Sequence, residues 1–269
     1  ERGLTFVHPF DDPHIIAGQG TVGLEILNEN TDIDTIVVPI GGGGLASGVV
    51  TAIKSRRPDI EVVGVETKLY PSMYEGMHGK EFTGGGVTIA EGIAVKQPGG
   101  LTLEICKEKL DDVVLVEESS IERSIQMMIE IEKSVVEGAG AAPLAALLDH
   151  PDRFKGKKVC LIISGGNIDT RLLAQVLMRG MAREGRLVRV RIEIPDVPGA
   201  LSTISALIGE EDANIIEVYH QRHFYDVPAK QTDVDMVLEV RDTQHGQQVI
   251  DRLIKEGFGG RLLGNTSLD

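Results

Sequence analysis

The sequence is poor in aromatic residues, which make up 4% of its 269 positions, and it contains no tryptophan. Hydrophobic residues nevertheless account for 42% of the chain and charged residues for 25%. Apolar content at this level can build a sizeable core, so the composition excludes a globally disordered chain. The length is typical of one or two globular domains.

Basic residues are in the minority, with 27 Lys and Arg against 41 Asp and Glu, and the formal net charge is −14. A nucleic-acid interface needs clustered cations to contact phosphates, so we expect no nucleic-acid partner. No apolar run approaches the roughly 20 residues of a membrane span, and we expect no membrane partner.

Only two cysteines occur, Cys106 and Cys160, and they form no CxxC pair. We interpret both as reduced core thiols, which predicts a cytoplasmic protein. The chain opens with ERGLTFVHPF, without an initiator methionine or a signal peptide. We therefore expect it to be part of a longer chain that begins inside a domain.

The first two thirds of the sequence alternate between strand and helix patterns. Residues 35–40 and 60–66 are β-branched runs typical of buried strands, and apolar residues between them recur at helical spacing. Ser119 and Glu122 have the spacing of a capping box that would begin a helix. Further strands are expected within 111–119 and over 157–164, with helices over 139–148 and 169–183. This α/β alternation predicts an open, mostly parallel sheet.

The pattern changes at residue 187. LVRVRIEI, residues 187–194, alternates apolar and charged side chains, as in a strand with one solvated face. The elements that follow have the order β–α–β–β–α–β, which predicts a ferredoxin-like α+β domain. We therefore place a first domain at 1–186 and a second at 187–264, with a hinge over 183–186.

Four consecutive glycines, Gly41–Gly44, separate the first strand from its helix. Bare backbone at a helix N-terminus attracts an anion, typically a phosphate, whereas a flexible linker is not expected inside a β–α–β unit. A Walker A loop would need a lysine that is absent here. The stretch GGGGLA also fits a dinucleotide-binding pattern, with Glu66 at the end of the next strand.

A second strand–glycine–helix junction, Ser164-Gly165-Gly166-Asn167, favours a different cofactor. One junction would hold a phosphate and the hydroxyl of Ser164 a ring nitrogen, which together suit pyridoxal phosphate. A dinucleotide would need a longer groove and gives Ser164 no clear use.

The first domain contains, in this order, the motifs HPFDD, IAGQGTVGLEI, VPIGGGGLASG, VVGVE, TIAEGIAV, VEGAGAAPLAALL and ISGGN. These motifs resemble those of the fold-type II, tryptophan-synthase-β-like pyridoxal-phosphate enzymes, in the same order. They are most similar to the threonine ammonia-lyases (threonine dehydratases) and their serine dehydratase and racemase relatives. The C-terminal unit, with IPDVPGAL and NIIEVYHQR, resembles an ACT domain.

The resemblance implies roles for particular residues. Gly41, Gly42, Gly43, Gly44 and the amide of Leu45 would bind the cofactor phosphate, and Ser164 would hydrogen-bond the pyridine nitrogen. Gly92 and Glu137 would lie near the cofactor ring and the substrate. Glu91 would lie beside Gly92, at a position where the family commonly has aspartate.

The family also needs a Schiff-base lysine, in an S-x-K-x-R-G-like segment upstream of the tetraglycine. No lysine of this chain has that setting, and Lys96, the nearest to a site motif, reads as solvated. We therefore expect no catalytic residue of that kind here and no turnover by this chain alone. In the complete enzyme, the implied reaction is β-elimination of L-threonine to 2-oxobutanoate and ammonia.

In the ACT-like unit, the turn that contains Asp196, Gly199 and Ala200, together with Asn214, would bind an amino-acid effector at a dimer interface. The alternative is that the unit only dimerises, and in either case we expect a homo-oligomer. We expect no metal site: Glu66 resembles a metal-ligating glutamate of some relatives, but its usual aspartate partner is missing near Ser72. The acidic pair Asp11-Asp12 reads as solvated.

Three alternatives to threonine ammonia-lyase stay open at this point. The first is a serine dehydratase or racemase that acts on L-serine. The second is a regulatory or oligomerising subunit, and the third is a nicotinamide-dependent oxidoreductase that carries an ACT domain.

Overall fold

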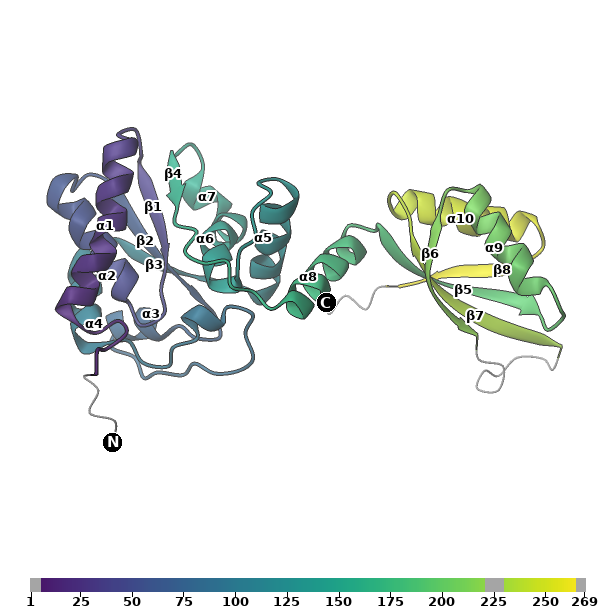
Figure 1. Cartoon of the computed structure of the whole chain (residues 1–269), viewed down its shortest axis with the longest axis horizontal. Helices are drawn as coiled ribbons and strands as arrows, with labels where there is room; N and C mark the ends of the chain where they lie inside the picture. Colours follow the sequence, from purple (N-terminus) through teal and green to yellow (C-terminus); the bar gives the residue numbers. More distant parts are fainter. Residues whose placement is uncertain (1–5, 221–229, 265–269) are drawn as a thin grey trace. The chain divides into compact units, whose positions relative to one another are not determined.

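The structure is a computed structural model that describes residues 6–220 and 230–264. The chain divides into two compact units, residues 1–173 and 174–269. The first unit is built on a four-stranded parallel sheet in the order β3-β2-β1-β4 (Figure 1). Its strands are β1 (Thr35–Pro39), β2 (Glu61–Thr67), β3 (Asp112–Val116) and β4 (Val159–Leu161).

Helices cover both faces of this sheet, which explains why β1 is buried along its whole length (Figure 1). On one side α2 (Gly44–Arg56) packs between α1 (Pro13–Glu29) and α4 (Gly100–Lys109). On the other side α6 (Gly138–Asp149) contacts β1, β2 and β3, accompanied by α5 (Glu118–Glu130) and α7 (Pro151–Phe154). The long connection between β2 and α4 contains α3 (Ser72–Met77) and the short 3₁₀ helix η1 (Glu91–Ile93).

The crossing of α1 and α2 depends on glycine. A Cβ atom on Gly48 would lie 2.3 Å from the carbonyl oxygen of Ile16 and 2.6 Å from the backbone nitrogen of Gly20. These are backbone atoms, which cannot rotate away. The two helices therefore approach one another closely enough only because position 48 has no side chain.

The second unit contains a four-stranded antiparallel sheet in the order β6-β7-β5-β8, with α9 and α10 on one face (Figure 1). The core between sheet and helices includes Val190, Ile192 and Ile204, all without solvent exposure. The elements are β5 (Leu187–Pro195), α9 (Ala200–Glu210), β6 (Asn214–His220), β7 (Gln231–Glu239), α10 (Thr243–Lys255) and β8 (Gly259–Leu263).

The predicted fold class is confirmed: a parallel α/β sheet is followed by a ferredoxin-like α+β unit. Helix α8 (Thr170–Arg183) crosses the division between the two compact units, and β5 begins at the expected residue 187. The domain limits 1–186 and 187–264 stay a prediction. Within the described ranges, no helix is both long and apolar enough to cross a membrane.

The predicted capping box at Ser119 and Glu122 is wrong. Helix α5 begins at Glu118, and its N-cap is Glu117, whose side chain makes no capping hydrogen bond. Ser119 therefore lies inside the first turn. The carboxylate of Glu118 instead accepts hydrogen bonds from Thr67 Oγ1, Thr88 Oγ1 and the N–H of Ile89, and so ties α5 to the connection after β2.

Candidate active site

A cleft opens at the carboxyl ends of β1 and β4, the edge at which open α/β sheets bind ligands. The tetraglycine follows β1, and the Ser164 loop follows β4, which pairs directly with β1. The cleft has a volume of about 270 Å³. Its lining includes every cofactor-site residue that the sequence suggested, namely Gly41–Gly44, Leu45, Gly92, Glu137 and Ser164.

The glycine loop has no room for side chains. A Cβ atom on Gly42 would lie 2.3 Å from the ring of Phe10, and one on Gly43 would lie 2.6 Å from Met73 Cε. Gly43 also has φ +92°, a backbone conformation that favours glycine, and it is the N-cap of α2. No side chain caps this helix, so its first N–H groups and its dipole are left for a ligand.

Two acidic residues that read as solvated in the sequence are helix caps, which corrects that interpretation. Asp12 accepts hydrogen bonds from the N–H groups of His14 and Ile15 and caps α1. Asp11 reaches the N-terminus of α4, where its carboxylate accepts from three consecutive N–H groups, including that of Thr102 at 3.2 Å. The segment HPFDD therefore fixes the walls beside the glycine loop.

Glu137 lies between the site's glycines. Its carboxylate caps α6 by accepting from the N–H groups of Ala139 at 2.8 Å and Gly140 at 3.1 Å. Its own N–H donates to the carbonyl of Gly165 at 3.1 Å, next to Ser164. Cβ atoms on Gly92 and Gly165 would approach Glu137 Oε1 to 3.3 and 3.0 Å, so both glycines lie close to this carboxylate.

Ser164 is exposed, and its hydroxyl makes no hydrogen bond within the described part of the chain. Glu91 is also exposed and begins η1, which brings its neighbour Gly92 to the cleft. Among the described residues, no lysine lines the cleft. The site therefore offers an anion cradle, a free hydroxyl and a carboxylate, without an amine nucleophile.

Glu66 has a structural use. Its buried carboxylate accepts hydrogen bonds from the N–H groups of Met73 and Tyr74, each at 2.8 Å, at the start of α3. Burial raises the pKa of Glu66 to about 8. Because Glu66 is occupied by these hydrogen bonds, it is not available to bind a ribose, as a dinucleotide site would require. Over residues 6–220 and 230–264, no group of three or more His, Cys, Asp or Glu side chains could hold a metal ion.

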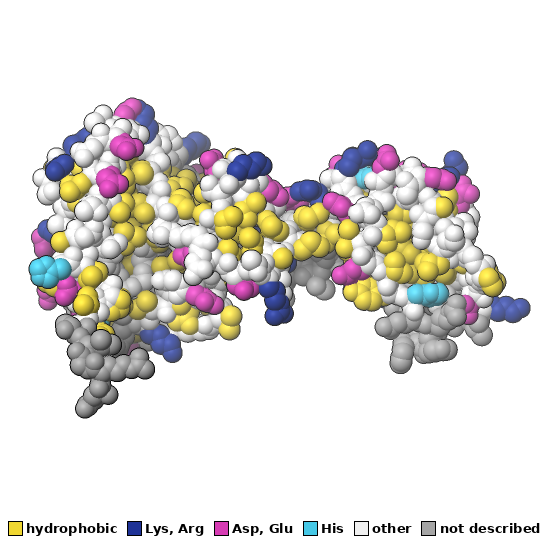
Figure 2. Space-filling model, viewed as in Figure 1, with side chains coloured by type: hydrophobic (Ala, Val, Ile, Leu, Met, Phe, Trp, Pro, Cys, Tyr) yellow, Lys and Arg dark blue, Asp and Glu magenta, His cyan; other side chains and the backbone are white. Residues whose placement is uncertain are grey.

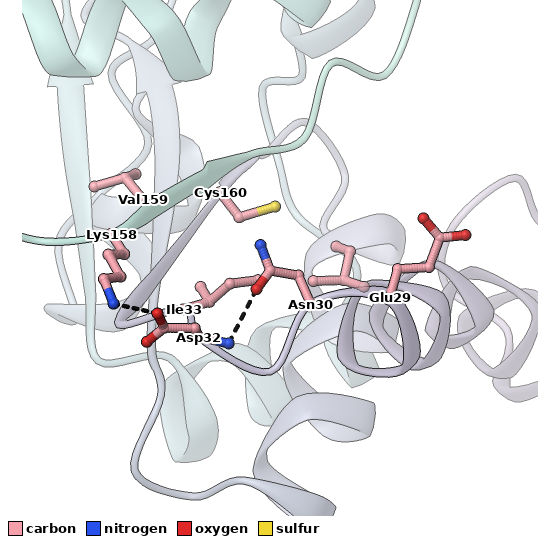
Figure 3. Close-up of a pocket in the computed structure, with 8 residues that line it drawn as sticks. Glu29, Asn30, Asp32, Ile33, Lys158, Val159 and Cys160 are labelled. Carbon is pink, nitrogen blue, oxygen red and sulfur yellow. Dashed lines mark hydrogen bonds and ion pairs between the residues drawn. The ribbon is translucent and has the colours of Figure 1, made fainter.

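A larger cavity, of about 600 Å³, lies at the opposite, amino-terminal ends of β1 and β4 (Figure 3). Lys158 forms an ion pair with Asp32 there, and the N–H of Asp32 donates to Asn30 Oδ1 at 3.0 Å. Burial raises the pKa of Cys160, so its thiol is a poor nucleophile. Because Lys158 and Asp32 are already paired with each other, this cavity is a weaker candidate than the glycine cleft.

In the second unit, the predicted effector residues lie at two separate places. Asp196, Gly199 and Ala200 form the turn after β5, with Gly199 at φ +90° as the N-cap of α9. Asn214 lies opposite Glu239, at the end of the sheet where β5 begins. The length of β5 separates the two places by roughly 26 Å, at about 3.3 Å per residue.

The cleft combines the features expected of a pyridoxal-phosphate site, and comparison with known families identifies the family of the chain. The model of the family described as "Pyridoxal-phosphate dependent enzyme" matches residues 1–165. The chain belongs to the pyridoxal-phosphate dependent enzymes. An ACT domain model matches residues 183–256. The nicotinamide-dependent oxidoreductase alternative is therefore set aside, and the resemblance drawn from the motifs is confirmed.

Several members of the family are similar to this chain. The L-threonine ammonia-lyase of Thermotoga maritima is 44% identical over 266 residues, covering 98% of this chain and 66% of its own length. A structure of threonine deaminase isoform 2 from Solanum lycopersicum matches with TM-score 0.62 and 34% identity, over 65% of this chain and 52% of that one. Serine racemase from Dictyostelium discoideum matches with TM-score 0.56 and 39% identity, over 61% and 53%. The chain thus spans about two thirds or less of the length of these relatives.

Proposed function

We propose that the glycine cleft binds pyridoxal phosphate and that the protein to which these residues belong is an L-threonine ammonia-lyase. The observation that carries the proposal is the joining of two junctions, Gly41–Leu45 and Ser164, in one cleft. Similarity to the L-threonine ammonia-lyase of Thermotoga maritima along 98% of this chain favours threonine as the substrate.

The residues of the cleft fit this cofactor. Gly42 and Gly43 leave a cradle that a Cβ atom would fill, at the N-terminus of a helix, where a dianionic phosphate is stabilised. We assign the phosphate to the N–H groups of Gly41–Leu45 and the pyridine nitrogen to the hydroxyl of Ser164. Glu137 and Gly92 would lie beside the ring and the substrate.

The chemistry that the cofactor supplies when bound is delocalisation of the electron pair left behind when a substrate loses its α-proton. Ser164 tunes this property because a neutral hydroxyl, unlike a carboxylate, does not hold the pyridine nitrogen protonated. A weaker electron sink favours loss of the β-hydroxyl over transamination. Glu137 is already fixed by two N–H groups and so presents its carboxylate in a constant position.

Serine is the second candidate substrate. The favouring observation is the similarity to serine racemase from Dictyostelium discoideum at 39% identity, higher than the 34% shared with the tomato threonine deaminase structure. A serine dehydratase or racemase would use the same cradle and the same Ser164. The two substrates differ by one methyl group, so competition for the loaded enzyme separates them.

We further propose that the ACT domain binds an amino-acid effector at the turn that contains Asp196, Gly199 and Ala200. Because Asn214 lies at the other end of the sheet in the same chain, a site that uses both places needs two copies, which favours a homo-oligomer. An unchanged melting temperature in the presence of isoleucine, valine and threonine would refute effector binding. The cytoplasmic location suggested by the two free cysteines stays a prediction.

The main proposal is tested by equilibrium dialysis of the 269-residue chain against pyridoxal phosphate, with inorganic phosphate as competitor. We expect saturable binding that inorganic phosphate displaces and that NAD leaves unchanged. Failure of pyridoxal phosphate to bind would refute the assignment. Steady 2-oxobutanoate formation from threonine would agree with the assignment of the cofactor site, but it would contradict the expectation that this chain has no catalytic lysine.

A further inference from the structure

The carbonyl group of Gly42 is held on the side of the loop away from the cleft. Thr102 Oγ1 lies 2.6 Å from the Gly42 oxygen, and the N–H of Gly99 donates to the same oxygen at 3.3 Å. Thr102 Oγ1 is also 3.2 Å from the carbonyl oxygen of Gly99. A hydroxyl has one proton to donate, and the shorter contact assigns it to Gly42.

Fixing this carbonyl also fixes the next N–H group. In a trans peptide the C=O of one residue and the N–H of the following residue point in opposite directions, and the described chain has no cis peptide bond. The N–H of Gly43 therefore points away from Thr102, to the side of the loop where Gly43 lines the cleft. We propose that Thr102 is a positioning residue, which aims the Gly43 N–H at the cofactor phosphate.

Thr102 is itself firmly held. It is completely buried in the first turn of α4, where the carboxylate of Asp11 accepts from its N–H at 3.2 Å. Its carbonyl accepts from the hydroxyl of Ser47 at 3.2 Å, which connects it to α2. Its side chain lies directly beneath the loop, since a Cβ atom on Gly43 would be 2.9 Å from Thr102 Cβ. The hydroxyl thus fixes one peptide group of the cradle in position relative to α2 and α4.

The inference rests on the proposed function, and it predicts an effect specific to the phosphate. In Thr102→Val the shape is kept and the hydroxyl is lost, so only the longer hydrogen bond from the N–H of Gly99, at 3.3 Å, still holds the Gly42–Gly43 peptide. We expect its affinity for pyridoxal phosphate to fall about tenfold, the equivalent of about 1.4 kcal/mol, while its affinity for pyridoxal, which has no phosphate, stays within twofold. Thr102→Ser keeps the hydroxyl and should restore binding to within about threefold of the original chain.

The chain offers a matched control. Thr35 is equally buried, and its hydroxyl donates to Glu61 Oε2 at 3.0 Å, at the far end of β1. Thr35→Val therefore removes a comparable hydrogen bond without touching the loop, and both affinities should stay unchanged. Affinities are measured by equilibrium dialysis, and far-UV circular dichroism verifies that each variant folds. If Thr102→Val does not fold, Thr102→Ala, which cannot overpack, takes its place.

The outcomes separate this inference from the proposed function. If the unmodified chain binds pyridoxal phosphate and Thr102→Val binds it equally well, the positioning role is overturned and the cofactor assignment stands. An equal loss for pyridoxal and pyridoxal phosphate also overturns the role, because it indicates general distortion. If the unmodified chain binds neither pyridoxal phosphate nor inorganic phosphate, both conclusions fall.

Discussion

Replacing Gly43 by alanine is the sharpest test of the cradle. Alanine at φ +92° is strained by about 1–2 kcal/mol. The reduced conformational freedom of the unfolded chain offsets about 0.5 kcal/mol of this cost. The new Cβ atom would also lie 2.6 Å from Met73 Cε and 2.9 Å from Thr102 Cβ. The methionine end can move, but Thr102 is held by α4, so overpacking adds about 1–3 kcal/mol. We expect a total loss of about 1.5–4.5 kcal/mol.

Gly156 provides a control within the same unit. It has φ +77°, and a Cβ atom there would meet nothing within 4 Å. Gly156→Ala therefore carries the strain alone and should cost about 1 kcal/mol. Urea unfolding followed by circular dichroism gives both values, taken from the transition of the first unit. Equal losses for the two variants would refute the steric argument, and undiminished binding of pyridoxal phosphate by Gly43→Ala would refute the cradle.

Three further predictions concern the framework of the site. Gly18→Ala, at an exposed position of α1 where a Cβ atom meets nothing within 4 Å, should stabilise the chain by about 0.5–1 kcal/mol. Gly48→Ala should destabilise it by about 3 kcal/mol, because its Cβ atom would collide with backbone atoms; the midpoints of urea unfolding measure both effects. Glu118→Gln disrupts a carboxylate that accepts three hydrogen bonds and should cost about 1–3 kcal/mol, while the neighbouring Glu117→Gln should cost less than about 1 kcal/mol. Similar losses for the two variants would contradict a stabilising role of the Glu118 hydrogen bonds. Burial raises the pKa of Glu66 to about 8, above its ordinary 4.5, so the folded chain retains a proton that the unfolded chain releases, and stability should fall as pH rises from about 4.5 to about 8. Glu66→Gln should reduce the change in the free energy of unfolding between pH 5 and 8. An unchanged pH dependence in this variant would contradict the raised pKa of Glu66.

The strands and the glycine cradle could be predicted from the sequence because their signals are local. The run over residues 35–40 is apolar and β-branched, and it forms the fully buried β1. Gly41–Gly44 lie between a strand and a helix, so their place at the carboxyl edge of the sheet follows from the β–α–β pattern. The same reasoning correctly joined them to Ser164, because both follow parallel strands.

Contacts between distant parts of the sequence could not be predicted in this way. The carboxylate of Asp11 caps α4 across 90 residues, and Thr102 reaches Gly42 across 60, and no periodicity marks either pair. Asp12 is different, since an aspartate followed by Pro13 is a recognisable helix start. The capping box failed because Glu117 already adopts the extended N-cap conformation two residues before Ser119.

The order of strands in the parallel sheet also affects how the chain can fold during synthesis. Among the four strands of this sheet, β1 comes first in the sequence but lies in the interior. The hydrogen bonds between Asp34 and Lys158, beside its pairing with β4, join residues 124 positions apart. At about 5–20 residues per second, a ribosome needs roughly 6–25 s to bridge that interval. For that time β1 lacks its β4 partner along one edge, and an unpaired apolar strand edge favours chaperone binding or aggregation. The loop that carries Ser164 emerges later still, so the cleft that it forms with the glycine loop is complete only when almost the whole first unit has been translated.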